Sequence, residues 1–374
     1  MRISGPVFVG LLATAAILGL SFYTMQDEPA LRRVAEAPTP VPAALPVETA
    51  SGEGRQTQDR RRSGAESGAN VERTLTDDGS VVNKYSPRSR DGNGPAIIEA
   101  PRIGQDPRLA GMPNEDLLED SPYGPLPAVS SAGLRPMDHY ARPWSGARGT
   151  RIAIIVGGLG LSQTGTQRAI EELPSEITLA FAASGNSLQR WMQTSRRQGH
   201  EILMQIPMEP FGYSPSDADP AILLADAPAE QNIDRLHEAM ARITGYTGIM
   251  NHLGGRFLSE TDALEPLLRD IASRGLMFVD DGTSARSASG SIAKAVALPH
   301  IFGDMVLDTE LDKTAILKKL DDLERLALRK GSAVGVASAF DESVQAIRQW
   351  VQEASGRGIE IVGVSALADD PADY

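Results

Sequence analysis

The feature that most constrains the fold of this chain is an alternation of short apolar runs with helical patterns between residues 151 and 362. The first run, residues 152–156, is apolar at every position, which is typical of a strand buried on both faces of a parallel sheet. Further largely apolar runs predict strands at residues 177–181, 201–206, 276–279, 333–337 and 359–362.

Between these runs, apolar residues recur at the three- and four-residue spacing of one helix face. The stripes are Leu236, Ala239, Met240, Ile243; Leu264, Leu267, Leu268, Ile271; Ile316, Leu320, Leu323, Ala327; and Val344, Ile347, Val351. The alternation predicts an α/β fold, either a barrel or a doubly wound sheet. In both architectures the active groups follow the carboxyl ends of the strands, so a few short loops hold the candidate site.

The composition of the chain excludes some classes of function. The formal net charge is −13, and residues 151–374 hold 20 Lys and Arg against 31 Asp and Glu. An acidic domain argues against nucleic acid as a partner, because neutralising phosphates requires clustered basic residues. The sequence has no cysteine, which excludes disulfides, thiolate zinc sites and cysteine nucleophiles.

The first residues are typical of a membrane anchor. Arg2 precedes an uncharged, mostly apolar stretch at residues 5–25. About 20 helical residues span roughly 30 Å, the thickness of a bilayer's hydrocarbon core. No small-x-small cleavage site follows, so we expect residues 1–26 to be an uncleaved anchor rather than a signal peptide. The positive end places the N-terminus in the cytoplasm and the remaining chain outside it.

Residues 27–147 have the composition of a disordered linker. Fifteen of the 25 prolines lie between Gln26 and Thr150, and no helical or strand period is sustained there. Residues 107–143 include apolar side chains that could pack on the domain as an arm. We therefore expect an anchor at 1–26, a linker with a possible packing arm at 27–147, and a folded domain at 148–374.

Polar and glycine residues follow several of the predicted strands. They are Gly157 and Gly158; Gln205 and Glu209; Asn251, His252 and Arg256; Asp280 and Asp281; and Ser338. The Gly157-Gly158-Leu159-Gly160 turn lacks the third glycine of a dinucleotide site and the Lys-Ser/Thr of a phosphate loop. It therefore indicates a tight turn from strand to helix.

In their order along residues 148–368, these segments resemble the divergent polysaccharide deacetylase family, a distant branch of the metal-dependent carbohydrate deacetylases. The most specific piece is Pro-Met-Glu-Pro at 207–210, after Gly-His-Glu at 199–201. Other pieces are Asn-His-x-Gly at 251–254, Phe-x-Asp at 278–280, Asp308, and Val-Ser at 364–365. The resemblance implies a distorted (β/α)₇ barrel of the polysaccharide deacetylase type. It also implies a role with cell-envelope polysaccharide or peptidoglycan.

The resemblance leads us to expect certain catalytic residues of the active relatives, and this chain replaces several of them. An Asp-Asp pair is expected where Gly157 and Gly158 stand, a histidine where Gln205 stands, and a catalytic His-Pro where Ser338 begins. Of the implied metal site, His252 and Asp280 are the only plausible remnants. Metal-assisted hydrolysis needs about three protein ligands and a base, so we expect no cofactor in a degenerate site. A zinc-like divalent metal is expected if the protein is active.

The sequence supports one hypothesis and leaves two others open. The first is a catalytically degenerate protein, tethered to the bacterial inner membrane and facing the periplasm, that binds glycan or an envelope protein partner. The second is an active deacetylase with a rebuilt site, in which Asp280 and Asp281 are the catalytic candidates. The third is a pure protein-interaction module.

For a glycan site, the sequence nominates polar residues over an aromatic floor. The polar candidates are Glu209, Asn251, His252 and Arg256, and the candidate floor is Phe211, Tyr213 and Phe257. Structural roles stay open as alternatives. His252 would then be a structural histidine at a strand end, and Asp280 and Asp281 would cap a helix starting near Thr283.

Overall fold

A computed structural model of the protein describes residues 69–75, 81–87, 109–214 and 221–373. The chain divides into two compact units, residues 1–94 and residues 95–374. In the first unit, strand β1 (Ala69–Leu75) pairs antiparallel with β2 (Val81–Pro87). This hairpin differs from the linker predicted for residues 27–147. The Asp78-Gly79 dipeptide between its strands is a hairpin signal that the search for longer periods passed over.

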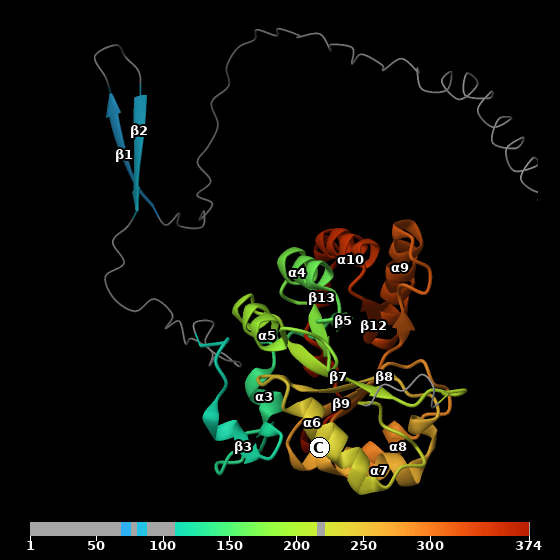
Figure 1. The fold of residues 1–374 in the computed structure, drawn as a ribbon. Helices are drawn as coiled ribbons and strands as arrows, with labels where there is room; N and C mark the ends of the chain where they lie inside the picture. The colour runs from blue at the N-terminus through green and yellow to red at the C-terminus, as the bar shows by residue number, and fades with distance from the viewer. Residues whose placement is uncertain (1–68, 76–80, 88–108, 215–220, 374) are drawn as a thin grey trace, which may run out of the picture. The chain divides into compact units, whose positions relative to one another are not determined.

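The second unit contains a curved, parallel sheet in the order β10-β9-β8-β7-β6-β5-β12-β11, with β13 also paired to β5. Its strands are β5 (Thr150–Leu159), β6 (Thr178–Ala182), β7 (Ile202–Met208), β8 (Gly248–Leu253), β9 (Met277–Asp280), β10 (His300–Phe302), β11 (Met305–Val306), β12 (Ser332–Ser338) and β13 (Ile359–Ile361). Every pairing in this sheet is parallel. The predicted α/β class is therefore confirmed, in the form of a half-barrel of parallel strands (Figure 1).

The first and last strands in this order, β10 and β11, both lie in one short segment, residues 300–306. β10 pairs with β9, whereas β11, two residues later, pairs with β12. Between them the Gly303 N–H donates to the Asp280 carbonyl at 2.7 Å, and the Asp304 N–H donates to the Val334 carbonyl at 2.8 Å. No strand pattern predicted this segment, because two- and three-residue strands are too short to show one.

The helices are amphipathic and pack on the outside of the sheet. They are α4 (Gln163–Glu172), α5 (Leu188–Arg197), α6 (Ala229–Met240), α7 (Thr261–Ser273), α8 (Ser289–Ala295), α9 (Lys313–Lys330) and α10 (Asp341–Ala354). α10 lies beside both α4 and α9, and α7 lies beside both α6 and α8 (Figure 1). Local signals bound α9: Asp312 caps it by accepting from the Ala315 N–H, and Gly331 ends it with φ of 89°.

Strand β5 shows why its sequence is apolar at every position. Ile152, Ile154 and Val156 pack in the core between sheet and helices. Ala153 and Ile155 point the other way and pack in a second cluster with apolar residues of the neighbouring strands. Successive side chains of a strand alternate between its faces, so both faces of β5 are covered. The four predicted helix stripes are buried in the first of these cores.

Residues 109–147 pack against the domain as an arm. The arm contains a 3₁₀ turn (Glu115–Leu117), β3 (Leu118–Ser121), β4 (Gly124–Pro127) and α3 (Pro136–Tyr140). Leu117 and Leu126 are buried, and Arg274 of the domain pairs with Glu119 and donates to the Pro127 carbonyl. The compact unit thus begins ahead of residue 148, the boundary that the sequence predicts.

Among the residues that the structure describes, no helix is both long enough and apolar enough to cross a membrane. The predicted anchor at 1–26 lies outside these residues. So do the parts of the predicted linker at 27–68, 76–80 and 88–108.

A buried carboxylate joins three distant segments at the amino end of the strands. Glu201, just ahead of β7, accepts hydrogen bonds from the N–H of Arg142, the N–H of Ser365 and the hydroxyl of Ser365. The hydroxyl of Thr247 lies 3.5 Å from the same carboxylate. At Gly363, a Cβ would lie 2.5 Å from the Glu201 carboxylate oxygen, so any side chain there would displace it. The Gly-His-Glu and Val-Ser motifs therefore meet in this carboxylate clamp.

Candidate functional site

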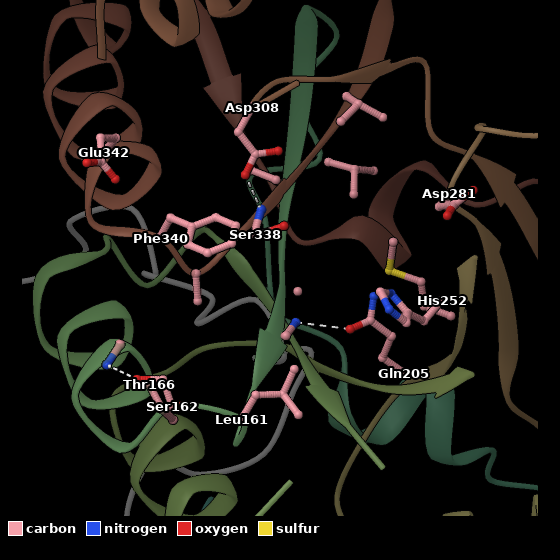
Figure 2. Close-up of a pocket in the computed structure, with 18 of the residues that line it drawn as sticks. Leu161, Ser162, Thr166, Gln205, His252, Asp281, Asp308, Ser338, Phe340 and Glu342 are labelled. Carbon is pink, nitrogen blue, oxygen red and sulfur yellow. Dashed lines mark hydrogen bonds between the residues drawn. The ribbon is translucent and has the colours of Figure 1, made fainter. Parts of the chain in front are cut away.

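A cleft of about 680 Å³ opens at the carboxyl ends of the strands. Residues at or just beyond the ends of β5, β7, β8, β9, β11 and β12 line it, together with the first turn of α4 (Figure 2). Catalytic and binding groups of barrel proteins gather at this end of the strands, and the volume lies within the range of small-ligand sites. We therefore take this cleft as the candidate site.

The end of β5 brings two glycines against the side chain of Gln205 from β7. The Gly158 N–H donates to Gln205 Oε1 at 3.0 Å (Figure 2). A Cβ at Gly157 would lie 3.0 Å from Gln205 Nε2, so the amide occupies the space that a side chain at 157 would need. The resemblance placed an aspartate and a histidine at these two positions. Here the glycine and the glutamine fit each other, and neither side chain offers the ligand expected there.

His252 lies on the cleft face of the neighbouring strand. Gln205 is in register with Met250, and His252 follows two positions later on the same face of β8. The ring is exposed to the cleft, and its partial desolvation there lowers the pKa of His252, an effect that the charge of Asp281 opposes. The imidazole is therefore neutral at pH 7, and no hydrogen bond holds it among the described residues. It is free to donate to one ligand atom and to accept from another.

The two adjacent carboxylates after β9 have separate environments. Asp281 lines the cleft, and its Oδ1 accepts from the N–H and the hydroxyl of Thr283 at 2.9 and 2.7 Å. Asp280 is fully buried outside the cleft lining. Its oxygens accept from the Gly282 N–H and from the hydroxyls of Ser287 and Ser289. The carboxylate of Asp280 is thus hydrogen-bonded within its own loop and away from the cleft, and the catalytic and metal-binding roles predicted for it stay predictions.

Neither aspartate caps a helix near Thr283, the structural alternative for this pair. The next helix, α8, begins at Ser289. Asp281 instead closes a short turn onto Thr283, as aspartate does in loops. Of the pair, Asp281 alone has its carboxylate on the wall of the cleft.

Three other predicted binding residues brace loops outside the cleft lining. Glu209 is buried and accepts from the Arg256 guanidinium and from the Ala225 N–H. Arg256 also pairs with Asp226. Asn251 accepts from the Asp281 N–H at 2.8 Å and donates to the Leu253 carbonyl.

Glu209, Asn251 and Arg256 therefore lie outside the lining of this cleft, and the substrate-binding role predicted for them stays a prediction. Their polar atoms form hydrogen bonds with neighbouring loops, and other groups line the cleft. Sequence proximity to His252 pointed to the right end of the sheet. It could not show which way each side chain turns, because alternate residues of a strand face opposite sides.

The apolar rim of the cleft differs from the predicted aromatic floor. Phe257 is in the core, and neither Phe211 nor Tyr213 is among the lining residues. Instead Leu161, Leu253 and Phe340, which are 60%, 52% and 49% exposed, line the cleft. Each of these three follows a strand end closely, which is the signal by which they could have been found.

Asp308 also lines the cleft and ties two of its loops together. Its Oδ2 accepts from the Ser338 N–H at 2.6 Å and from the Ser343 hydroxyl at 2.9 Å. Asp308 was noted in the sequence as part of the family pattern, without a role. Ser338, at the place of the expected histidine, contributes its backbone N–H to this contact.

The donors of the cleft do not fit the metal that the resemblance implies. Within the described residues, no group of three His, Cys, Asp or Glu side chains could hold a metal ion. Gly157 and Gly158 offer no side-chain ligand, the oxygen of Gln205 faces a backbone N–H, and Asp280 is turned away. A structural or catalytic zinc needs at least three protein ligands. The predicted remnants, His252 and Asp280, do not come together on one cleft wall.

Comparison with known proteins places the chain in a family. The sequence model described as "Divergent polysaccharide deacetylase" matches residues 154–368. The chain belongs to this family, as its motifs predicted.

The chain is also similar to three individual proteins from bacteria. An uncharacterized protein of Agrobacterium tumefaciens, known from its crystal structure, is 68% identical. The match covers 65% of this chain and 99% of that one, with a TM-score of 0.64. An uncharacterized protein of Haemophilus influenzae is 22% identical over 58% of this chain and 76% of its own length. The uncharacterized protein YibQ of Escherichia coli is 21% identical over 59% of this chain and 68% of its own length.

Proposed function

We propose that the protein binds cell-envelope glycan without hydrolysing it, through the cleft at the carboxyl ends of its strands. The observation that carries this proposal is the fit between Gly157 and Gln205, which fills the position of an expected metal ligand with a neutral amide. The remaining scaffold is a half-barrel of parallel strands. The cleft still offers hydrogen-bonding groups and an apolar rim to a ligand.

The cleft has the two kinds of group that sugar recognition needs. Gln205, His252 and Asp281 can exchange hydrogen bonds with hydroxyl groups. The exposed side chains of Leu161 and Phe340 can cover the apolar face of a pyranose ring. We therefore assign glycan binding to this cleft, in preference to a purely protein-binding role.

The proposal includes a location. Residues 1–26 would hold the chain in a bacterial inner membrane, with the domain in the periplasm, where peptidoglycan and other envelope polysaccharides are accessible. Support comes from the uncharged stretch at 5–25 behind Arg2. A reporter that is active only after export, fused after Tyr374, should be active. Activity of a reporter that works only in the cytoplasm would contradict this location.

Glycan binding can be tested with two matched phenylalanines. Phe340 lines the cleft, whereas Phe211 is similarly exposed, at 54%, outside its lining. We expect Phe340→Ala to weaken the binding of chitooligosaccharides or peptidoglycan fragments about tenfold, an aromatic contact worth roughly 1 kcal/mol or more. Phe211→Ala should leave the affinity unchanged.

Isothermal titration of the full chain and the two variants measures these affinities. Equal losses for both variants would place the binding surface elsewhere. The absence of glycan binding, together with capture of an envelope protein that depends on Phe340, would favour the protein-interaction role instead.

A further inference from the structure

The cleft has a one-sided charge. Asp281, Asp308, Asp341 and Glu342 line it, and no lysine or arginine is among its lining residues, all of which the structure describes. Asp341 pairs with Arg168 of α4. In the described part of the chain, the other three carboxylates have no ion pair. A neutral glycan would have to desolvate these charges without neutralising them, which is unfavourable.

A second group in the cleft lacks a partner within the protein. Gln205 is 8% exposed, and its Oε1 accepts from the Gly158 N–H. A backbone N–H is a donor, so the amide oxygen must face it, and the amide orientation is fixed. The NH₂ group of Gln205 then remains on the cleft side, with no acceptor among the described residues (Figure 2). This nitrogen is open to the cleft rather than sealed in the core, so it can donate to a ligand that supplies an oxygen there.

The two observations specify a ligand with both a cation and oxygen acceptors. A free amino sugar has both, because its protonated amine donates three hydrogen bonds and its hydroxyl oxygens accept them. An N-acetylated sugar has a neutral amide with one N–H, so it cannot neutralise the negative charge of the carboxylates. The apolar rim of Leu161, Leu253 and Phe340 is available to either ring.

We infer that the cleft selects glycans with free, protonated amino groups over their N-acetylated counterparts. The ligand class is thus the deacetylated form of an amino-sugar polymer. This inference rests on the proposed glycan-binding function and narrows it to one chemical class. Gln205 contacts a sugar oxygen, and Asp281 with its neighbouring carboxylates receives the ammonium group.

The test compares two oligosaccharides of equal length on the full chain. They are a glucosamine oligomer and the matching N-acetylglucosamine oligomer, titrated at low salt and at about pH 6, where the amino groups are largely protonated and the carboxylates stay ionised. We expect the glucosamine oligomer to bind at least about tenfold more tightly, since hydrogen bonds to charged groups are worth roughly 1.5–3 kcal/mol. Added salt should reduce this preference, because it screens the attraction between charges.

Two conservative variants identify the groups responsible. Asp281→Asn keeps the acceptor for Thr283, and Glu342→Gln alters an exposed residue, so both should fold. Each should weaken the glucosamine oligomer and leave the N-acetylated oligomer nearly unchanged. Asp262→Asn, an exposed carboxylate at the start of α7 and outside the cleft lining, is the charge-matched control and should alter neither.

The chain has a net charge of −13, so unspecific attraction of cations needs its own control. Oligolysine of matching charge should bind more weakly than the glucosamine oligomer and be insensitive to Asp281→Asn. Oligolysine binding that equals the glucosamine oligomer and depends on Asp281 would overturn the inference in favour of a basic peptide. Equal binding of the two oligosaccharides would overturn the inference and leave the proposed function standing. Binding of neither would overturn both.

Discussion

The two ends of the parallel sheet use their carboxylates in opposite ways. At the amino end, Glu201 is fully buried, and its oxygens accept from Arg142 and from both donors of Ser365. At the carboxyl end, Asp281 faces an open cleft and accepts from Thr283 alone. Glu201 therefore holds distant segments together, whereas Asp281 can still accept hydrogen bonds from a ligand.

This contrast explains why the family is easy to recognise although several residues of its active pattern are replaced. Gly-His-Glu and Val-Ser, two of the motifs that carried the resemblance, meet at the amino end, where residues of a barrel serve stability. The positions that differ from the active pattern, Gly157 and Gln205, lie at the carboxyl end, where the chemistry takes place. The fold can therefore persist while the site changes its function.

The largest expected effect is at the amino end. Replacing Glu201 with alanine would leave the partly buried N–H groups of Arg142 and Ser365 without their acceptor. We expect the free energy of unfolding to fall by about 3–5 kcal/mol, as when one partner of a buried charged network is removed. Chemical denaturation of this variant measures the loss. The control is Glu353→Ala, an exposed glutamate of α10, which should change stability by less than about 0.5 kcal/mol.

A loss below about 1 kcal/mol for Glu201→Ala would show that the carboxylate clamp does not stabilise the fold. The contrast between the two ends of the sheet would then break down.

A pH-dependent effect of similar size is expected at His300. Burial lowers the pKa of His300 to about 4, and the charges of Asp280 and Asp369 only partly oppose this. The Ser289 hydroxyl donates to Asp280, so Ser289 accepts from the imidazole Nε2, which must carry a proton in the neutral ring. Between pH 6.5 and 4 the unfolded chain binds a proton that the folded chain does not bind. Stability should therefore fall as the pH falls through this window, by about 3 kcal/mol.

Denaturation curves at pH 7, 5.5 and 4 measure this loss. The variant His300→Gln keeps a donor toward Ser289 without titrating, so it should show a smaller loss than the parent chain. Some loss should remain, because burial also lowers the pKa values of His139, His200 and His252. An unchanged slope in His300→Gln would contradict this assignment.

The smallest effect on stability is expected at the cleft. Replacing His252 with alanine should weaken glycan binding by roughly 1–3 kcal/mol, because desolvated ligand groups would lose their partner. The melting temperature should stay nearly the same, since the described residues give this imidazole no hydrogen bond to lose. A variant that melts earlier and binds equally well would make His252 a structural residue. Titration and thermal melting of the same samples distinguish the two results.

The sequence was most informative where its pattern is long. The apolar runs and helix stripes predicted the α/β fold, because residues such as Ile154 and Leu320 must be buried wherever the sheet forms. Strands β10 and β11 were missed because strands of two or three residues carry too little pattern. The seven-residue strands of the β1–β2 hairpin were missed because the Asp-Gly turn signal between them was passed over.

The sequence pointed to the same end of the sheet as the cleft, and only some of the predicted residues line it. His252 and Asp281 line the cleft, whereas Asp280, Asn251 and Glu209 turn toward neighbouring loops. Adjacent residues of a strand face opposite sides, so a motif alone cannot tell a lining residue from a bracing one. The contact between Gly157 and Gln205 joins two positions 48 residues apart and required the structure.

The central claim is that this cleft binds glycan without metal-assisted hydrolysis. The most direct test incubates the full chain with zinc, nickel or cobalt, removes unbound metal, and measures both bound metal and acetate released from N-acetylglucosamine oligomers and peptidoglycan fragments. The account predicts less than one metal ion per chain and no acetate, from samples that bind glycan. One tightly held metal per chain, together with acetate release that is lost in His252→Ala, would contradict it and identify an active deacetylase with a rebuilt site.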